Sequence, residues 1–213
     1  MRIIFIRHGE SEANAAGFIN DNPTRPVSLT ERGRAQAEAA SNELCAARFT
    51  HAYASEFPRA QQTAAILLRH QACPLHIDAR INERKTGMDG LPVKTFHDLV
   101  YPDPLRTKPE RGESFLEQME RLRSFMDEIA ARHPAGTVLA VSHENPILAA
   151  LALSADDLEQ TARSSIANCG WVEMKWPVKQ YMMSDAHGTR LSAIQPNLRL
   201  LRHRASGLPS HPE

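Results

Sequence analysis

The sequence has few cysteines, no excess of either charge and no long hydrophobic run. Its three cysteines, Cys45, Cys73 and Cys169, lack the spacing of metal ligands, and their odd number argues against a disulfide framework. A formal net charge of +0 gives no overall field that would hold nucleic acid or an anionic membrane. No run of about 18 apolar residues is present to span a bilayer. We therefore expect a cytoplasmic protein that binds neither nucleic acid nor membranes.

Lysine is also scarce. Only five of the 25 basic residues are lysines, and the other 20 are arginines. The planar guanidinium group suits phosphate and carboxylate ligands, so this bias is compatible with oxyanion binding. Genomic base composition explains the bias about as well. Because the net charge is zero, any anion site must come from a local arrangement of side chains.

Apolar runs that favour strands alternate with stretches of helical period. Strands are expected at residues 3–6, 52–54, 75–77 and 137–141, with two later strands at 171–176 and 190–194. Helices are expected at 34–47 after a Ser28 capping box, from Pro58, near 96–101, around 119–129, and at 147–153 after Pro146. The alternation predicts a three-layer α/β/α sandwich with a mostly parallel central sheet.

The expected domain organisation is simple. One domain covers residues 1–201, and within it residues 85–113 lose periodicity and gather prolines, which is typical of an irregular segment that covers a site. Residues 202–213 mix Gly, Pro, His and Ser without period and are expected to form a disordered tail.

Polar side chains follow three of the expected strands. Ligands in open α/β sheets bind outside the carboxyl ends of the strands, so these residues are the candidates for chemistry. The first strand leads into Arg7-His8-Gly9-Glu10-Ser11, the second into Ser55 and Arg59, and the strand at 137–141 into Ser142-His143-Glu144-Asn145. Two histidines and two arginines would thus converge at one edge of the sheet.

These motifs resemble those of the histidine phosphatase superfamily, which has the phosphoglycerate-mutase-like fold. The resemblance covers about residues 1 to 175. It is carried, in order along the chain, by Arg7-His8-Gly9-Glu10-Ser11 with Asn14, Leu29-Thr30-Glu31-Arg32-Gly33, Arg59-Ala60-Gln61-Gln62-Thr63-Ala64, Glu83 followed by Gly87-Met88-Asp89-Gly90, Gly112-Glu113-Ser114, Val141-Ser142-His143, and Asn168-Cys169.

The chemistry of these residue types agrees with the resemblance. A neutral imidazole has a free nitrogen lone pair at pH 7, so His8 can attack phosphorus and become a phosphohistidine. Arg7 and Arg59 can bind the phosphoryl oxygens in place of a metal ion, and a protonated His143 would add a third positive donor. The resemblance implies that Asn14 donates an amide hydrogen bond. It also implies that Glu83 protonates the leaving group and then activates water.

Glu144 departs from the family pattern. It stands where the family commonly has Gly, and a carboxylate there would repel a phosphate dianion unless it is turned away or paired. Three interpretations stay open: Glu144 points outward, it favours protonation of His143, or it binds a cationic part of the substrate and so contributes to specificity.

The function expected from these residues is metal-independent hydrolysis of a small phosphomonoester through phospho-His8, as in a histidine acid-type phosphatase. No cofactor and no metal are expected. The stretch between Glu83 and Gly112 is short, whereas mutases of the family carry a long insertion that keeps water from the phosphoenzyme, so hydrolysis is favoured over transfer. A cofactor-dependent mutase, a phosphoprotein phosphatase and a non-catalytic phosphate-binding module remain alternatives. The substrate and the oligomeric state stay open, with a homodimer among the alternatives.

Overall fold

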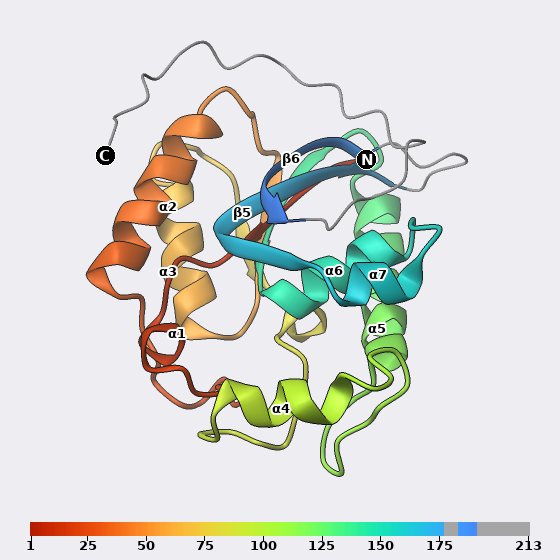
Figure 1. Ribbon diagram of the computed structural model, residues 1–213. Helices are drawn as coiled ribbons and strands as arrows, with labels where there is room; N and C mark the ends of the chain where they lie inside the picture. The colour runs from red at the N-terminus through yellow and green to blue at the C-terminus, as the bar shows by residue number, and fades with distance from the viewer. Residues whose placement is uncertain (177–182, 191–213) are drawn as a thin grey trace, which may run out of the picture.

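The computed structural model describes residues 1–176 and 183–190. These form an α/β sandwich around a six-stranded sheet with the order β3-β2-β4-β1-β5-β6 (Figure 1). The expected strand at 190–194 lies outside the described residues except for Arg190, and so does the expected tail at 202–213. Among the described helices, none is both long enough and apolar enough to cross a membrane.

Four parallel strands and two antiparallel strands make up the sheet. The parallel strands are β1 (Arg2–Arg7), β2 (His51–Ala54), β3 (Leu75–Ile77) and β4 (Thr137–Ser142). The antiparallel strands are β5 (Ser165–Lys175) and β6 (Met183–Arg190), with β6 at one edge. The mostly parallel sheet expected from the sequence is confirmed, although β5 begins six residues earlier than its apolar run indicated.

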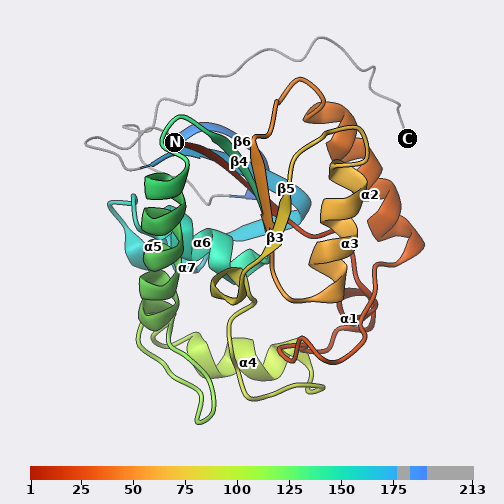
Figure 2. The same cartoon turned by 180° about the vertical axis from the view of Figure 1, so that it is seen from behind.

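Side chains of the central strands alternate between two hydrophobic cores because successive residues of a strand point to opposite faces. Ile3 and Phe5 of β1 pack with helices α5 (Phe115–Arg132) and α6 (Glu144–Ala152). Ile4 and Ile6 pack with helices α2 (Glu31–Glu43) and α3 (Pro58–Leu67) on the other face. Figures 1 and 2 show these helix pairs on opposite sides of the sheet. Both faces of β1 are thus buried, which explains its continuous apolar run.

Two helix starts differ from the sequence-based predictions. Helix α2 begins at Glu31 rather than residue 34 and ends at Glu43 rather than residue 47. The capping residue is Thr30, whose hydroxyl accepts from the Gly33 amide at 3.0 Å, whereas the Ser28 hydroxyl accepts from Gln62 at 3.2 Å. The prediction of a Ser28 capping box was therefore wrong.

Helix α6 also begins earlier than predicted, at Glu144, directly after His143 at the N-cap. Pro146 lies in the first turn, where its missing N–H leaves no helical hydrogen bond unmade. Sequence periodicity missed the two five-residue helices, α1 (Glu12–Ala16) and α7 (Leu158–Ala162), because they are too short to display a helical period.

The segment 85–113 contains helix α4 (Val93–Val100), close to the short helix expected near 96–101. A 3₁₀ turn, η1 (Ala79–Ile81), precedes the segment. Backbone bonds join the segment to the loop after α1, from the Gly90 amide to Ile19 O at 2.7 Å and from the Ile19 amide to Leu91 O at 2.8 Å. Figure 1 shows α4 beyond the end of the sheet where α1 also lies. We refer to residues 85–113 as the covering segment.

Candidate active site

His8 directly follows β1 and is buried. Its Nδ1 lies 2.6 Å from Gly9 O, and a carbonyl only accepts, so Nδ1 carries the proton and Nε2 carries the lone pair. The His8 amide donates to Ser142 O at 3.0 Å, which ties the ends of β1 and β4 together. A Cβ atom on Gly9 would lie 2.2 Å from Gly33 O, so only glycine fits beside this histidine.

Arg59 connects the two histidines. The residue lies near the start of α3. Its Nε donates to His8 Nε2 at 3.0 Å, and its Nη2 donates to His143 Nδ1 at 3.2 Å. Burial lowers the pKa of Arg59 to about 10, which still leaves the guanidinium charged near pH 7. Asn20 fixes the other end of this group: its Oδ1 accepts from Nη1 and its backbone oxygen accepts from Nη2 at 3.2 Å. Sequence reasoning missed Asn20, which lies in an irregular loop 39 residues before Arg59.

His143 lies at the end of β4 as the N-cap of α6 and is fully buried. Its Nδ1 accepts from Arg59, so Nε2 carries the proton and donates to Ser55 Oγ at 2.7 Å. Burial and the positive charges of Arg59 and Arg7 lower the pKa of His143 well below its usual range. The same causes lower the pKa of His8. With these neighbours both imidazoles are neutral near pH 7, and a protonated His143 would require an anion close by.

Arg7 and Glu144 form an ion pair at 3.2 Å. Arg7 Nη1 also donates to Ile166 O, and Glu144 Oε1 accepts from the Ile166 amide at 2.9 Å. Both carboxylate oxygens of Glu144 therefore have partners. Its negative charge is paired with Arg7, so it does not face a phosphate as an unpaired charge. Arg7 Nε is buried and has no hydrogen-bond partner among the described residues.

Glu83 follows η1 in an irregular loop, with its side chain half-buried. Its Oε1 accepts from the Arg84 amide at 2.8 Å and from Asn145 Nδ2 at 3.3 Å. Burial raises the pKa of Glu83, and the Arg84 amide with the charges of Arg59 and Arg7 offsets part of that rise. Asn145 stood in the motif after the strand at 137–141, but the motif itself indicated no role for it.

Asn14 lies in helix α1 with an exposed side chain. Its Oδ1 accepts from the Ser11 amide at 3.1 Å, from Ser11 Oγ at 3.0 Å and from Asn168 Nδ2 at 3.3 Å. These bonds use the side-chain oxygen of Asn14, so its side-chain nitrogen, Nδ2, can donate to another acceptor. Asn168 Nδ2 also donates to His8 O at 3.1 Å, so Asn14 is linked to the loop that carries His8. Cys169, with φ 57°, donates its backbone amide to the same oxygen at 3.3 Å.

The arrangement joins ends of β1, β2 and β4 with the start of α3. The two histidine rings lie with centroids 5.0 Å apart, and Arg59 bonds to both. The lone pair of His8, two guanidinium groups and one carboxyl of raised pKa are the parts that transfer of a phosphoryl group needs. Within the part of the chain that the structure describes, no group of three or more His, Cys, Asp or Glu side chains is placed to hold a metal ion.

Comparison with known proteins agrees with this arrangement. The family model described as histidine phosphatase superfamily (branch 1) matches residues 3–185. The chain therefore belongs to the histidine phosphatase superfamily, whose members include phosphatases and mutases.

Relatives of both kinds are found. The chain is 31% identical over 154 residues to an adenosylcobalamin/alpha-ribazole phosphatase of Salmonella typhimurium, covering 68% of this chain and 74% of the relative. It is 32% identical over 150 residues to a 2,3-bisphosphoglycerate-dependent phosphoglycerate mutase of Thermoplasma acidophilum, covering 70% and 73%. A crystal structure of a putative alpha-ribazole-5'-P phosphatase from Escherichia coli shares the fold with a TM-score of 0.76 at 23% identity, covering 92% of this chain and 99% of the other.

Proposed function

We propose that this protein is a metal-independent phosphomonoester hydrolase that acts on a small phosphorylated metabolite through phospho-His8. The observation that carries the proposal is the unprotonated Nε2 of His8, which faces a charged guanidinium at 3.0 Å while Nδ1 is fixed by Gly9 O at 2.6 Å. A neutral imidazole fixed in this tautomer is ready to attack phosphorus. Arg7, Arg59, Asn14 and His143 would bind the phosphoryl oxygens.

In the first half-reaction, a bond forms between His8 Nε2 and phosphorus, and the bond from phosphorus to the ester oxygen breaks. Negative charge grows on the phosphoryl oxygens and on the leaving oxygen. Arg59 stabilises the phosphoryl oxygens together with Arg7, whose Nε has no partner among the residues that the structure describes, and the proton held on Glu83 passes to the leaving alkoxide. The dianion also favours proton uptake by His143, which turns Nδ1 into a third donor.

In the second half-reaction, a water oxygen attacks the phosphorus of phospho-His8 and the bond from phosphorus to nitrogen breaks. Glu83, now ionised, accepts a proton from the attacking water, which returns it to its starting state. One carboxyl group therefore serves both steps. Inorganic phosphate leaves, and Arg59 again donates to the lone pair of His8.

A mutase is the second candidate, because one relative named above carries that activity. A mutase would return the phosphoryl group to a second hydroxyl of the bound acid, so water must be kept from phospho-His8. The covering segment spans only residues 85–113, and α4 is its single helix of eight residues. This short cover favours hydrolysis. Product analysis separates the two, because a mutase releases an isomeric phosphoester and a hydrolase releases inorganic phosphate.

We also propose that Glu144 contributes to substrate choice, acting through Arg7. Its ion pair at 3.2 Å places a negative charge beside one of the two arginines that would bind phosphate. Removing the carboxylate in Glu144→Gly is expected to change the relative rates over a panel of phosphoesters that differ in charge, and Glu144→Gln separates loss of charge from loss of the hydrogen bond to Ile166. Unchanged relative rates in both variants would remove this role.

The first test of the proposed function is phosphate release from a panel of small phosphoesters in excess chelator. Wild-type protein is expected to release phosphate, and His8→Ala is expected to lose activity by several orders of magnitude because the variant lacks the imidazole that would accept the phosphoryl group. Near wild-type release by His8→Ala would contradict the proposal. Release only from a phosphopeptide would favour a phosphoprotein phosphatase, and binding of phosphate without release from any ester would favour a non-catalytic module.

A further inference from the structure

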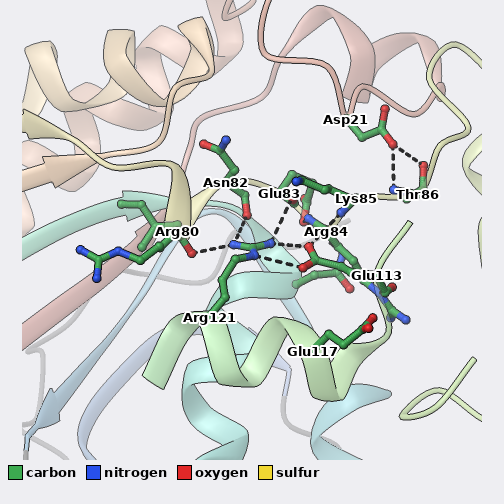
Figure 3. Close-up of polar contacts among 12 residues, drawn as sticks. Asp21, Arg80, Asn82, Glu83, Arg84, Lys85, Thr86, Glu113, Glu117 and Arg121 are labelled. Atoms are coloured by element: carbon green, nitrogen blue, oxygen red, sulfur yellow. Dashed lines mark hydrogen bonds and ion pairs between the residues drawn. The ribbon is translucent and has the colours of Figure 1, made fainter. Parts of the chain in front are cut away.

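Arg121 of helix α5 points its guanidinium group at the backbone of the loop that carries Glu83 (Figure 3). Its Nη1 donates to Arg80 O at 2.6 Å and to Asn82 O at 3.1 Å, and its Nη2 donates to Glu83 O at 3.4 Å. One side chain thus binds three carbonyl oxygens within four consecutive residues. This part of the chain runs from within the short η1 turn into the loop after it, and neither a strand nor an α-helix holds it.

Glu113 fixes Arg121 in this orientation. Arg121 Nε donates to Glu113 Oε2 at 3.1 Å, and Nη2 donates to Glu113 Oε1, so the pair is bidentate. Such a fork holds a guanidinium plane in one direction, which a single hydrogen bond does not. Both side chains are largely buried, with 19% and 13% of their surfaces exposed. The pair is neutral as a unit, so it anchors the loop without adding net positive charge beside the Glu83 carboxyl group.

The same pair closes the base of the covering segment. Glu113 Oε1 accepts from the Lys85 amide at 3.0 Å, and the Glu113 amide donates to Lys85 O at 2.9 Å. The first and last residues of the 85–113 segment are therefore joined to each other, and Glu113 joins this pair to Arg121. Arg84 adds to this anchor, because its Nε donates to Glu113 O at 3.1 Å.

Asp21 binds the chain just after Glu83, at the start of the covering segment, from the side opposite Arg121, as Figure 3 also shows. Asp21 Oδ2 accepts from the Thr86 amide at 2.7 Å, from Thr86 Oγ1 at 2.8 Å and from the Gly87 amide at 2.7 Å. Asp21 directly follows Asn20, which binds Arg59. The Glu83 loop therefore lies between Arg121 on one side and the loop that orients Arg59 on the other.

We propose that Arg121, oriented by Glu113, is a positioning residue that holds Glu83 where it can protonate the leaving oxygen. This inference rests on the proposed function, in which Glu83 is the proton donor. A proton donor on a loop needs such support, because a displacement of about 1 Å can cost about a hundredfold in rate. Loss of Arg121 therefore impairs the step that needs the proton and leaves phosphate binding by Arg7 and Arg59 intact.

The test compares two esters that differ in their need for a proton. The alkoxide of β-glycerophosphate must be protonated as it leaves, whereas p-nitrophenolate leaves without a proton. In Arg121→Met, kcat/KM is expected to fall by about 10- to 100-fold for β-glycerophosphate and by less than about threefold for p-nitrophenyl phosphate. Arg121→Lys keeps the charge but not the fork, so its loss is expected to be smaller and to have the same selectivity.

Two further variants make the result decisive. Arg123→Met removes an exposed arginine from the same helix and is expected to leave both esters at wild-type rates. Glu83→Gln is the benchmark for loss of the proton donor and is expected to show the same selectivity more strongly. Thermal melting followed by circular dichroism shows whether each variant is folded at the assay temperature. If Arg121→Met is unfolded there, the comparison of the two esters is made with Arg121→Lys.

The outcomes separate the inference from the proposed function. Selective loss in Glu83→Gln and in the Arg121 variants supports both. In a second outcome, Glu83→Gln loses kcat/KM selectively for β-glycerophosphate, but the Arg121 variants lose it equally for both esters or not at all. This outcome overturns the positioning role of Arg121 and leaves the proton-donor role of Glu83 intact. An equal loss on both esters in Glu83→Gln overturns the proton-donor role itself, and the role of Arg121 falls with it.

Discussion

Burial shifts the pKa of three titratable residues at the centre of the site. It lowers the pKa of His8 and of His143, and it raises the pKa of Glu83. The charges of Arg7 and Arg59 also lower the pKa of both histidines, and they oppose the rise in the pKa of Glu83. The result is a pair of neutral imidazoles beside a carboxyl group that keeps its proton to a higher pH than usual. These opposite shifts bring the titration ranges of the imidazoles and the carboxyl group closer together, which suits the roles of nucleophile and proton donor proposed above.

These shifts predict the pH dependence of kcat/KM for an alkyl phosphate. The acid limb is expected below pH 6.5, the usual pKa of histidine, because the lowered pKa keeps His8 unprotonated in mildly acidic solution. The alkaline limb is expected to follow the raised pKa of Glu83, and it should be absent in Glu83→Gln. A steady-state pH profile checks this. An acid limb above pH 6.5, or an alkaline limb that persists in Glu83→Gln, would contradict the assignment.

The same shifts predict how stability depends on pH. An unfolded chain protonates its histidines near pH 6.5, while folded His143 resists protonation, so below that pH the unfolded state binds more protons. Stability is therefore expected to fall as pH falls below 6.5, by up to about 1.4 kcal/mol per pH unit for each such histidine. His143→Gln is expected to make this slope shallower. Urea unfolding at several pH values measures it, and an unchanged slope would contradict a lowered pKa for His143.

Element boundaries show how local hydrogen bonds override sequence patterns. Thr30 rather than Ser28 caps α2, and α6 begins at Glu144, so that the buried imidazole of His143 lies at the N-cap of the helix. Where a helix begins therefore fixes the placement of one of the site residues. The short helix α1 acts similarly, because its capping box between Ser11 and Asn14 orients the Asn14 amide.

The cap of α2 predicts a difference between two neighbouring variants. Thr30→Ala removes the acceptor for the Gly33 amide and is expected to cost about 1 kcal/mol, which lowers Tm by about 2–4 °C in a chain of this size. Ser28→Ala is expected to stay within about 0.5 kcal/mol. Differential scanning calorimetry of both variants checks this, and a larger loss in Ser28→Ala would restore Ser28 as the cap.

The strands and their polar ends could be predicted from the sequence, and the supporting residues could not. Buried strands such as β1 and β4 show as short apolar runs, and chain topology alone brings Arg7, His8 and His143 to one edge. Asn20 and Arg121 act across loops, 39 residues from Arg59 and 38 from Glu83. Their partners depend on loop conformations that no local periodicity encodes, so sequence patterns did not reveal them.

At the scale of the whole molecule, the sheet divides the hydrophobic interior into two cores with different tasks. The core under α2 and α3 holds the helix that carries Arg59. The core under α5 and α6 supports His143 and Arg121. The site lies where β1, β2 and β4 end. Both cores pack against these strands, so each core supports a part of the site.

Core truncation is expected to be costly on the α5 side. Leu122, next to Arg121, is fully buried, and Leu122→Ala is expected to destabilise the fold by about 2–5 kcal/mol. Leu99→Ala, at a side chain that is 40% exposed, is the control and is expected to cost much less. Urea denaturation measures both. Equal losses would contradict the placement of Leu122 in the core.

The central claim is that His8 accepts the phosphoryl group, and trapping the phosphoenzyme tests it most directly. Wild-type protein would be mixed with a substrate from the panel, quenched in alkali to preserve the phosphorus–nitrogen bond, and mapped by mass spectrometry. A phosphate adduct on His8, absent from His8→Ala, is the result we predict. Rapid turnover by wild-type protein with the adduct on another residue, or the same adduct in His8→Ala, would contradict the account.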